Sequence, residues 1–179
     1  MADKPPIFLI TGTPGAGKSS VAVALMRRFP LGLNIPIDDL REWVVSGGAS
    51  PVPVWTDETT RQFHLARKSA AQIARLYADA GFAVAIDDVI FPAEAQAVYA
   101  APLSTYSVHK ILLKPDIEIA LARNASRTNK SFDTAGLAGI IRQIHDAMPV
   151  SVFTRAGWIV IDSTHLTLDG TVDDILRRI

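Results

Sequence analysis

Cysteine is absent from the 179-residue sequence, and its absence excludes several kinds of site. No disulfide framework, thiolate metal centre or cysteine nucleophile can form without it. The four histidines do not fall at the spacings of a metal site, and neither G-x-S-x-G nor H-E-x-x-H occurs. His145 lies next to Ile144 in a helical pattern and is interpreted as a packed helix residue. Thiol chemistry and histidine metal centres are therefore not expected.

An excess of charge is also missing, because 18 Lys and Arg residues balance 18 Asp and Glu residues. Nucleic-acid-binding proteins usually carry a basic excess, so a nucleic-acid partner is not expected. No apolar run reaches membrane-spanning length, and the apolar stretch in "MADKPPIFLI" is too short for a signal peptide. We therefore expect no membrane association, a cytoplasmic location, and one globular domain over residues 1–179.

Short apolar segments alternate with helical patterns along the chain, which indicates βα units around a parallel sheet. Most of the apolar segments are hydrophobic throughout, as expected when helices cover both faces of a sheet. The predicted strands are residues 7–11, 33–37, 82–86, 108–113 and 158–161. The sequence therefore predicts an α/β protein with three α/β/α layers and a five-stranded parallel sheet.

Five helices follow from the 3.6-residue periodicity and its end signals. The longest begins after Thr56 and ends at Gly81. Its apolar face consists of Phe63, Ala66, Ala70, Ala74 and Tyr77. The other four helices begin near Gly17, Pro115, Asp133 and Val172.

Two segments between these elements are typical of loops that move over a site. "SGGASPVPVW" at 46–55 is rich in Gly, Pro and Ser, whereas "ASRTNKSF" at 125–132 is polar and basic. Neither separates two cores, so neither is a domain boundary. We predict a substrate flap at about 43–56 and a short lid at about 124–133.

The segment "GTPGAGKSS" follows the first predicted strand and matches the pattern G-x-x-x-x-G-K-[ST] of a P-loop. Glycines allow the loop to curl so that successive backbone N–H groups point at phosphates, and the following helix adds its positive N-terminal dipole. Lys18 would contact the β- and γ-phosphates, and the Ser19 hydroxyl would bind Mg²⁺. The predicted nucleotide-binding residues are Gly12, Thr13, Pro14, Gly15, Ala16, Gly17, Lys18, Ser19 and Ser20.

A first acidic pair, Asp38 and Asp39, follows the second predicted strand. Ligands of open parallel sheets lie beyond the carboxyl ends of the strands, so this pair should lie near the P-loop. Asp39 and Glu42 have the spacing of a capping box, which leaves Asp38 as the candidate that accepts a proton from a substrate hydroxyl. Arg41 is interpreted either as a contact for an anionic or polar part of the substrate or as a surface residue.

A second acidic pair, Asp87 and Asp88, ends the third predicted strand in "AVAIDD". Four apolar residues followed by Asp form a Walker B pattern. Many strands end in Asp, so the pattern indicates a metal-binding residue mainly because the chain also has a P-loop. Asp87 is the candidate that orients Mg²⁺, through water. Asp88 is the alternative for that role, or it faces the acceptor as a substrate residue.

The basic lid places Arg123 and Arg127 four residues apart, with Lys130 beyond. A guanidinium group can stack on adenine or neutralise charge on a transferred phosphoryl group. Arg123 is therefore a candidate for nucleotide binding. The segment "IDSTHLTLDG" at 161–170 follows the last predicted strand, and this position in the topology could bring it beside the adenine.

With these features together, the chain resembles the small P-loop kinases of the nucleoside-monophosphate-kinase-like group. Within that group it is most similar to the chloramphenicol phosphotransferase-like family. The resemblance is carried by "GTPGAGKSS", "IPIDD", "AGFAVAIDDVIF", "ARNASRTNK", "QIHDAM" and "WIVIDST", which span nearly the whole chain in the family's order. It implies ATP, Mg²⁺ and phosphoryl transfer to a hydroxyl. It assigns Asp38 as base, Lys18 and Ser19 to phosphates and metal, and Arg127 to the lid.

Three functions remain open from the sequence. The leading hypothesis is a kinase that phosphorylates a hydroxyl of a small molecule, with antibiotics such as chloramphenicol among the acceptors. The spacing Asp38-x-x-Arg41 is also similar to polynucleotide kinases and to zeta-toxin-like sugar-nucleotide kinases, although the neutral net charge disfavours the polynucleotide version. A nucleotide-dependent regulatory ATPase without an acceptor is the third possibility. The sequence leaves the acceptor and the oligomeric state open.

Overall fold

A computed structural model describes residues 4–126 and 137–179 of the chain. Its strands are β1 (Ile7–Thr11), β2 (Gly32–Pro36), β3 (Ala83–Asp87), β4 (Val108–Leu113) and β5 (Ile159–Ile161). Its helices are α1 (Lys18–Met26), α2 (Ile37–Glu42), α3 (Asp57–Asp79), α4 (Pro92–Tyr99), α5 (Ile117–Ala125), α6 (Ala138–Asp146), α7 (Val150–Arg155) and α8 (Leu168–Arg177). The five strands form one parallel sheet in the order β2-β3-β1-β4-β5, which confirms the predicted sheet.

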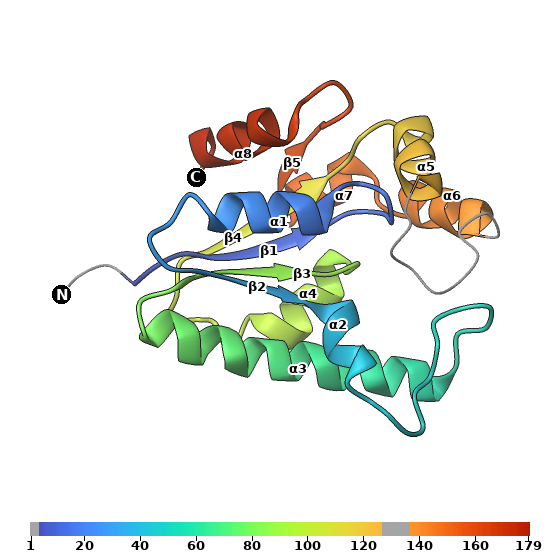
Figure 1. The fold of residues 1–179 in the computed structure, drawn as a ribbon, viewed down its shortest axis with the longest axis horizontal. Helices are drawn as coiled ribbons and strands as arrows, with labels where there is room; N and C mark the ends of the chain where they lie inside the picture. Colours follow the sequence, from blue (N-terminus) through green and yellow to red (C-terminus); the bar gives the residue numbers. More distant parts are fainter. Residues whose placement is uncertain (1–3, 127–136) are drawn as a thin grey trace.

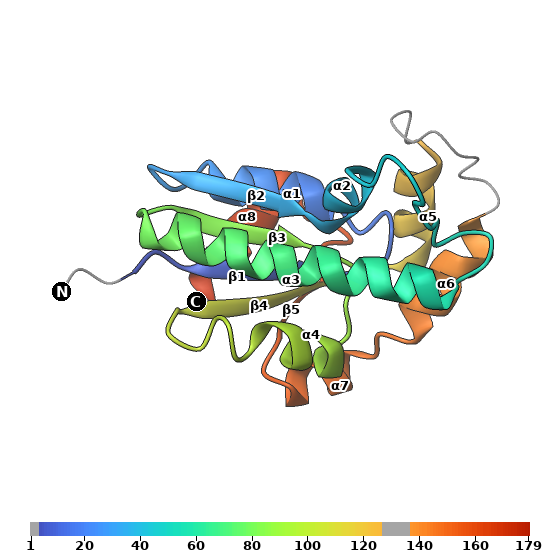
Figure 2. The same ribbon diagram turned by 90° about the horizontal axis from the view of Figure 1, so that it is seen from below.

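The sheet lies between two layers of helices (Figures 1 and 2). On one face, α1 and α8 pack on side chains that include Phe8 and Ile10 of β1. On the other face, α3, α4 and α7 pack on a second core cluster that includes Ile7 and Leu9 of the same strand. All five residues of β1 are buried, because successive side chains point to opposite faces and both faces are covered. The predicted three-layer fold is therefore confirmed.

Helix α3 forms where its predicted start after Thr56 and its apolar pattern place it. Thr56 is the N-cap, and its side chain accepts a hydrogen bond from the backbone N–H of Thr59 in a capping box. Phe63, Ala66, Ala70 and Ala74 are buried against the sheet, as expected. Tyr77 is the exception to the predicted face, because 37 % of its surface is exposed. It lies at the end of the helix and packs edge-on against Phe82, with ring centroids 5.2 Å apart.

The second strand lies one residue earlier than predicted, at Gly32–Pro36, because Ile37 already belongs to α2. Pro36 lacks an N–H group and its fixed φ suits the entry to a helix. The predicted capping box of Asp39 and Glu42 is therefore wrong. Asp39 lies inside α2, and the N-cap is Pro36, which makes no side-chain capping bond.

Three short helices were not predicted, namely α2, α4 and α7, which have six, eight and six residues. Fewer than three turns show too little periodicity to be distinguished from a loop. The last helix begins at Leu168, earlier than the expected Val172, because Thr167 caps it by accepting from the backbone N–H of Gly170. Asp133, the expected cap of the helix before Pro149, lies outside the described residues.

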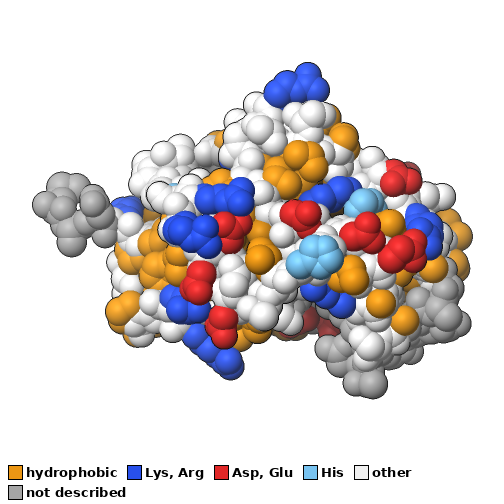
Figure 3. Space-filling view, turned by 90° about the horizontal axis from the view of Figure 1, so that it is seen from above, with side chains coloured by type: hydrophobic (Ala, Val, Ile, Leu, Met, Phe, Trp, Pro, Cys, Tyr) orange, Lys and Arg blue, Asp and Glu red, His pale blue; other side chains and the backbone are white. Residues whose placement is uncertain are grey.

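The surface over α1 and α8 mixes acidic and basic side chains (Figure 3). Arg28, just after α1, pairs with Asp169 at 3.3 Å and with Asp173 at 3.0 Å, both on α8. Opposite charges are therefore interspersed on this face. In the described part of the chain, no helix has both the length and the apolar character needed to cross a bilayer.

Candidate active site

The P-loop connects β1 to α1 as the sequence predicts, with Gly15 and Gly17 at φ values of 85° and 93°. Such positive φ values favour glycine. Gly15 also lies against α5, where an added Cβ would stand 2.0 Å from the carbonyl oxygen of Ala120. The loop is held from two sides, because Thr13 donates its hydroxyl to the carbonyl of Ile141 at 3.1 Å and Lys18 Nζ donates to the carbonyl of Thr13 at 3.3 Å.

The strand register brings the P-loop and both acidic pairs to one edge of the sheet. Asp87, the last residue of β3, is paired with Ile10 of β1 on one side and with Pro36 of β2 on the other. The P-loop begins two residues after Ile10, and Asp38 lies two residues after Pro36. Asp87 therefore stands between the strand that leads to the P-loop and the strand that leads to Asp38.

The four candidate site residues at this edge differ in their exposure. Asp38 and Ser19 are exposed, each in the first turn of its helix, whereas Lys18 is half-buried and Asp87 is 5 % exposed. An exposed carboxylate and a buried one at the same edge can serve different partners. Within the described residues, no group of three or more His, Asp or Glu side chains is arranged to hold a metal ion by itself.

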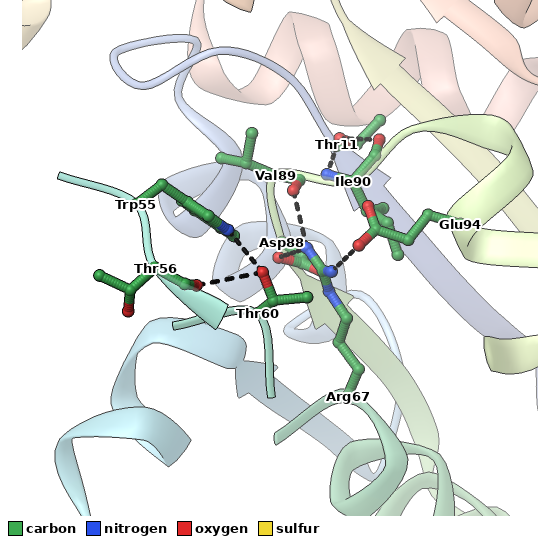
Figure 4. A network of polar contacts seen from close by, with 9 residues as sticks. All are labelled: Thr11, Trp55, Thr56, Thr60, Arg67, Asp88, Val89, Ile90 and Glu94. Carbon is green, nitrogen blue, oxygen red and sulfur yellow. Dashed lines mark hydrogen bonds and ion pairs between the residues drawn. The ribbon is translucent and has the colours of Figure 1, made fainter. Parts of the chain in front are cut away.

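Asp88 lies next to Asp87 in sequence but belongs to a different set of contacts, which sequence reasoning missed (Figure 4). The Nε group of Arg67 on α3 donates to Asp88 Oδ2 at 2.6 Å, and its Nη2 group donates to Asp88 Oδ1 at 3.4 Å. Arg67 also pairs with Glu94 of α4 and donates to the carbonyl of Val89 at 3.0 Å. We call Arg67, Asp88 and Glu94 the Arg67 cluster.

The Arg67 cluster is buried at its centre, where Arg67 is 4 % and Asp88 6 % exposed. Burial raises the pKa of the Asp88 carboxyl to about 6, against the opposing effect of the Arg67 guanidinium. The nearby Asp38 carboxylate adds to this rise. The sequence held one signal for the cluster, because Arg67 interrupts the apolar face of α3 between Ala66 and Ala70, and a charge on such a face requires a partner.

Arg41 joins α2 to the expected flap and to α3. Its Nη2 group donates to the carbonyl of Ala49 at 2.5 Å, and its guanidinium carbon lies 3.9 Å from the centroid of the Phe63 ring. Burial lowers the pKa of the Arg41 guanidinium, and the nearby Asp38 carboxylate opposes that shift. Among the ion pairs of the described residues, none involves Arg41, whereas Arg67 takes part in two.

The flap itself is attached to α3 at several points. Gln62 accepts from the backbone N–H of Ala49 at 2.9 Å and donates to the carbonyl of Gly47 at 2.8 Å. The Trp55 ring stacks on Phe63 with centroids 4.9 Å apart, and its Nε1 group donates to Thr60 at 2.7 Å. Large apolar side chains nevertheless remain exposed along the flap, and they are Trp43, Val44, Val45, Val54 and Trp55.

Arg123 lies on α5, and its Nη2 group donates to the carbonyl of Ser163 at 3.3 Å, just after β5. It therefore contacts the 161–170 segment that the sequence placed near the adenine. A cavity of about 380 Å³ opens close by, with Lys114, Asp162 and Thr164 among its lining residues. Arg127 and Lys130, the other basic residues of the expected lid, lie outside the described residues.

Residues 7–149 match the model of the AAA_33 family, described as an AAA domain, and the chain belongs to this family. No curated protein sequence matches the chain.

Solved structures share the fold at low sequence identity. The tunicamycin resistance protein of Deinococcus radiodurans superposes with a TM-score of 0.64 at 16 % identity, covering 98 % of this chain and 95 % of its own. The APS kinase of Mycobacterium tuberculosis, solved with AMPPNP and APS, gives 0.64 at 15 % identity over 98 % and 97 %. Shikimate kinase from Acinetobacter baumannii, solved with shikimate, gives 0.64 at 17 % identity over 98 % and 92 %. The fold is therefore that of the small P-loop kinases.

Proposed function

We propose that this protein is an ATP-dependent kinase that transfers the γ-phosphoryl group to a hydroxyl of a small molecule. The observation that carries this proposal is the register of the sheet. Asp87 of β3 pairs with Pro36 of β2 and with Ile10 of β1, and this pairing brings Asp38 and the P-loop to one edge of the sheet. Membership of the AAA_33 family and the fold shared with shikimate kinase and APS kinase support it. The fold shared with a tunicamycin resistance protein, and the resemblance to chloramphenicol phosphotransferases, support an antibiotic as the acceptor.

On the nucleotide side, backbone N–H groups of the P-loop and the N-terminus of α1 bind the phosphates of ATP. Lys18 places its ammonium group on the β- and γ-phosphates. Arg123 covers the adenine from α5, where its contact with Ser163 holds it beside the segment after β5. Arg127 supplies positive charge to the transferred phosphoryl group from the lid.

The residues at this edge suit a magnesium ion, because Mg²⁺ prefers oxygen ligands and keeps several waters. The Ser19 hydroxyl is exposed in the first turn of α1, and the Asp87 carboxylate comes from the neighbouring strand. These two side chains would hold the ion, Asp87 through water. When bound, Mg²⁺ offsets the negative charge of the phosphates.

Asp38 serves as the general base on the acceptor side. The acceptor hydroxyl gives its proton to the Asp38 carboxylate as its oxygen forms a bond to the γ-phosphorus. The bond between that phosphorus and the bridging β–γ oxygen breaks, which leaves ADP and a phosphorylated acceptor. The exposed position of Asp38 at the start of α2 leaves the carboxylate accessible to a substrate.

Arg41 and Asp88 shape the acceptor side. Arg41 positions the flap through Ala49 and Phe63 and presents its charge beside Asp38, where a polar or anionic part of the acceptor binds. Asp88, held by Arg67, supports the end of β3 on the acceptor side. The exposed Trp43 and Trp55 of the flap contact apolar parts of the acceptor.

The proposal is tested by measuring ADP release from ATP and Mg²⁺ in the presence of a panel of hydroxylated metabolites and antibiotics. We expect at least one acceptor to raise ADP release well above the acceptor-free rate and to gain one phosphoryl group by mass spectrometry. Equal hydrolysis with and without every acceptor would instead support a regulatory ATPase. Phosphorylation of an oligonucleotide 5′-hydroxyl, with none of the small molecules accepted, would support a polynucleotide kinase.

A further inference from the structure

A second cavity, of about 550 Å³, lies between α4, the segment before β4, and the end of α7. Leu9, Tyr99, Leu103, Tyr106, Lys110 and Ala156 are among its lining residues. None of its lining residues belongs to the P-loop, to α2 or to the flap. Its volume falls within the range of about 300–1,000 Å³ that is usual for small-molecule sites. Figure 2 shows α4 and α7 along the same margin of the sheet, beside β4 and β5.

The cavity exists because the helices do not cover the first half of β4. Ile111, Leu112 and Leu113 are buried, whereas Val108, His109 and Lys110 are only half-buried. Side chains alternate along a strand, so Val108 and Lys110 share a face with Leu112, which belongs to the core under α3, α4 and α7. A lysine is thus part of the floor of the cavity, at a position where a covered parallel strand would carry an apolar residue.

The Lys110 ammonium group can donate more hydrogen bonds than it makes to the described residues. Its Nζ atom donates to the carbonyl of Ala156 at 2.7 Å, at the C-terminus of α7. An ammonium group has three donors, and this is the one hydrogen bond it makes to the described residues. Lys110 takes part in none of the ion pairs between described residues, in contrast to Lys4, which pairs with Asp79 at 2.8 Å. The ammonium therefore brings a positive charge to the cavity without a carboxylate to balance it.

Most of the remaining lining is apolar or aromatic, and Gln96 and Ser104 are its polar members. Leu9 and Leu103 are buried beneath the cavity, and Tyr99 is 2 % exposed. The Tyr106 hydroxyl donates to Asp79 at 2.9 Å, so the polar end of that side chain is already bound. Alanines at several lining positions, including Ala100, leave room for a ring to approach the backbone of α4.

We propose that this cavity binds a small organic anion, with an aromatic or similarly flat apolar body and a carboxylate that pairs with Lys110. The apolar body packs on Leu9, Leu103 and the aromatic side chains. Removal of the body from water provides binding energy, and the partly buried charge gives preference for the anion over a neutral analogue. None of the lining residues has a role in the proposed active site, so the inference does not depend on kinase activity.

The test compares 2-naphthoate with its neutral amide, 2-naphthamide, in titrations of the 179-residue chain followed by amide NMR spectra. We expect 2-naphthoate to shift the signals of α4 and of residues 103–110 and to bind about tenfold more tightly than the amide, because only the carboxylate pairs with Lys110. Equal affinities for the two probes would overturn the charge assignment. Shifts confined to other parts of the chain would overturn the site.

Two variants separate the ligand's contacts from general effects on folding. Lys110→Met keeps the apolar stem and removes the charge, so it should abolish the preference for 2-naphthoate. Ala100→Leu fills the cavity while Lys110 remains, so it should weaken both probes about tenfold or more. Lys68→Met, at an exposed lysine of α3, is the matched control and should change neither affinity. Unchanged binding in Ala100→Leu would contradict the proposal, whatever Lys110→Met does.

Discussion

The phosphate-binding loop and the acceptor side of the candidate site are built in different ways. The P-loop is a continuous run of residues whose backbone conformation depends on glycines at fixed positions and on contact with α5. The acceptor side is assembled from side chains of α2, the flap, α3 and α4, which are spread over the stretch from Ile37 to Tyr99. A backbone site of the first kind is encoded locally, whereas the second depends on packing among distant segments.

The basic side chains of the candidate site fall into two kinds according to their partners. Arg67 is buried and matched by Asp88 and Glu94, so its charge is used within the protein. Lys18 and Arg41 contact backbone carbonyls in hydrogen bonds at 3.3 Å and 2.5 Å. A buried cation that pairs with two carboxylates is a structural element. A cation beside a loop and a carboxylate at the sheet edge is instead placed to meet a ligand. The predictions below test this division.

The largest effect is expected at the P-loop from Lys18→Ala. Lys18 is half-buried and faces the loop, so the fold should be retained while phosphoryl transfer falls by about three orders of magnitude or more. Steady-state ADP release gives the rate, and thermal unfolding gives the control for folding. Near-normal turnover in the variant would remove the assignment of the P-loop to catalysis.

On the acceptor side, Arg67→Met should affect stability first. Its removal leaves Asp88 buried without its cation and Glu94 without its partner, and breaking a buried pair in this way lowers the free energy of unfolding by about 3–5 kcal/mol. Urea unfolding at pH 7 measures it. Arg61→Met is the matched control, because Arg61 on the same helix pairs with Glu58 at the surface, where an ion pair contributes little to stability. Similar losses in the two variants would contradict the structural role of Arg67.

The Arg67 cluster should also give stability a distinctive pH dependence. The pKa of Asp88 is about 6 in the folded protein, above its ordinary value of 3.8, so the folded state binds the proton more tightly than the unfolded state. Its contribution to stability is therefore present below about pH 4 and is lost as pH rises through 6. Unfolding free energies of wild type and Asp88→Asn, measured from pH 4 to pH 7, isolate this group. Wild type should lose up to about 3 kcal/mol relative to the variant over this range. A relative gain would mean that pairing with Arg67 outweighs burial.

Asp38→Asn tests the base while keeping the size of the side chain. A positioned carboxylate contributes about 10²–10⁴-fold to proton transfer, and the loose transition state of phosphoryl transfer favours the lower end, so kcat should fall about 100-fold. ATP affinity, measured by calorimetry, should change little. Asp39→Asn is the matched control and should keep rate and stability, because Asp39 is an exposed residue within α2. If Asp39→Asn abolishes the rate and Asp38→Asn does not, the two roles are reversed.

Much of the fold was predictable from the sequence because its signals are local. Apolar strands, the P-loop and the start of α3 after Thr56 each depend on a few consecutive residues, and the structure confirms the predicted sheet. The short helices α2 and α4 were not predicted, because a helix of six or eight residues is too short to show the 3.6-residue periodicity of apolar side chains.

The partners of the acidic residues were less predictable than the strands that carry them. Asp87 and Asp88 are adjacent in sequence, yet alternation along the strand end sends them to different surroundings. The pairing of Asp88 with Arg67 and Glu94 needs the packing of α3 and α4 on the sheet, which no local pattern specifies. The same holds for Arg41, whose contacts with Ala49 and Phe63 exist only because the flap folds back on α3.

The smallest effect is expected from Trp55→Ala in the flap. Trp55 is 53 % exposed and stacks on Phe63 with one face, so its loss removes apolar surface from the acceptor side and leaves the P-loop unchanged. With the acceptor found in the panel, KM for that acceptor should rise severalfold, KM for ATP should stay the same, and kcat should fall little, because uniform binding rather than transition-state stabilisation is lost. Leu76→Ala is the matched control, since Leu76 is 70 % exposed near the opposite end of α3. A rise in KM for ATP in Trp55→Ala, or the same rise for the acceptor in both variants, would show that the flap does not belong to the acceptor side alone.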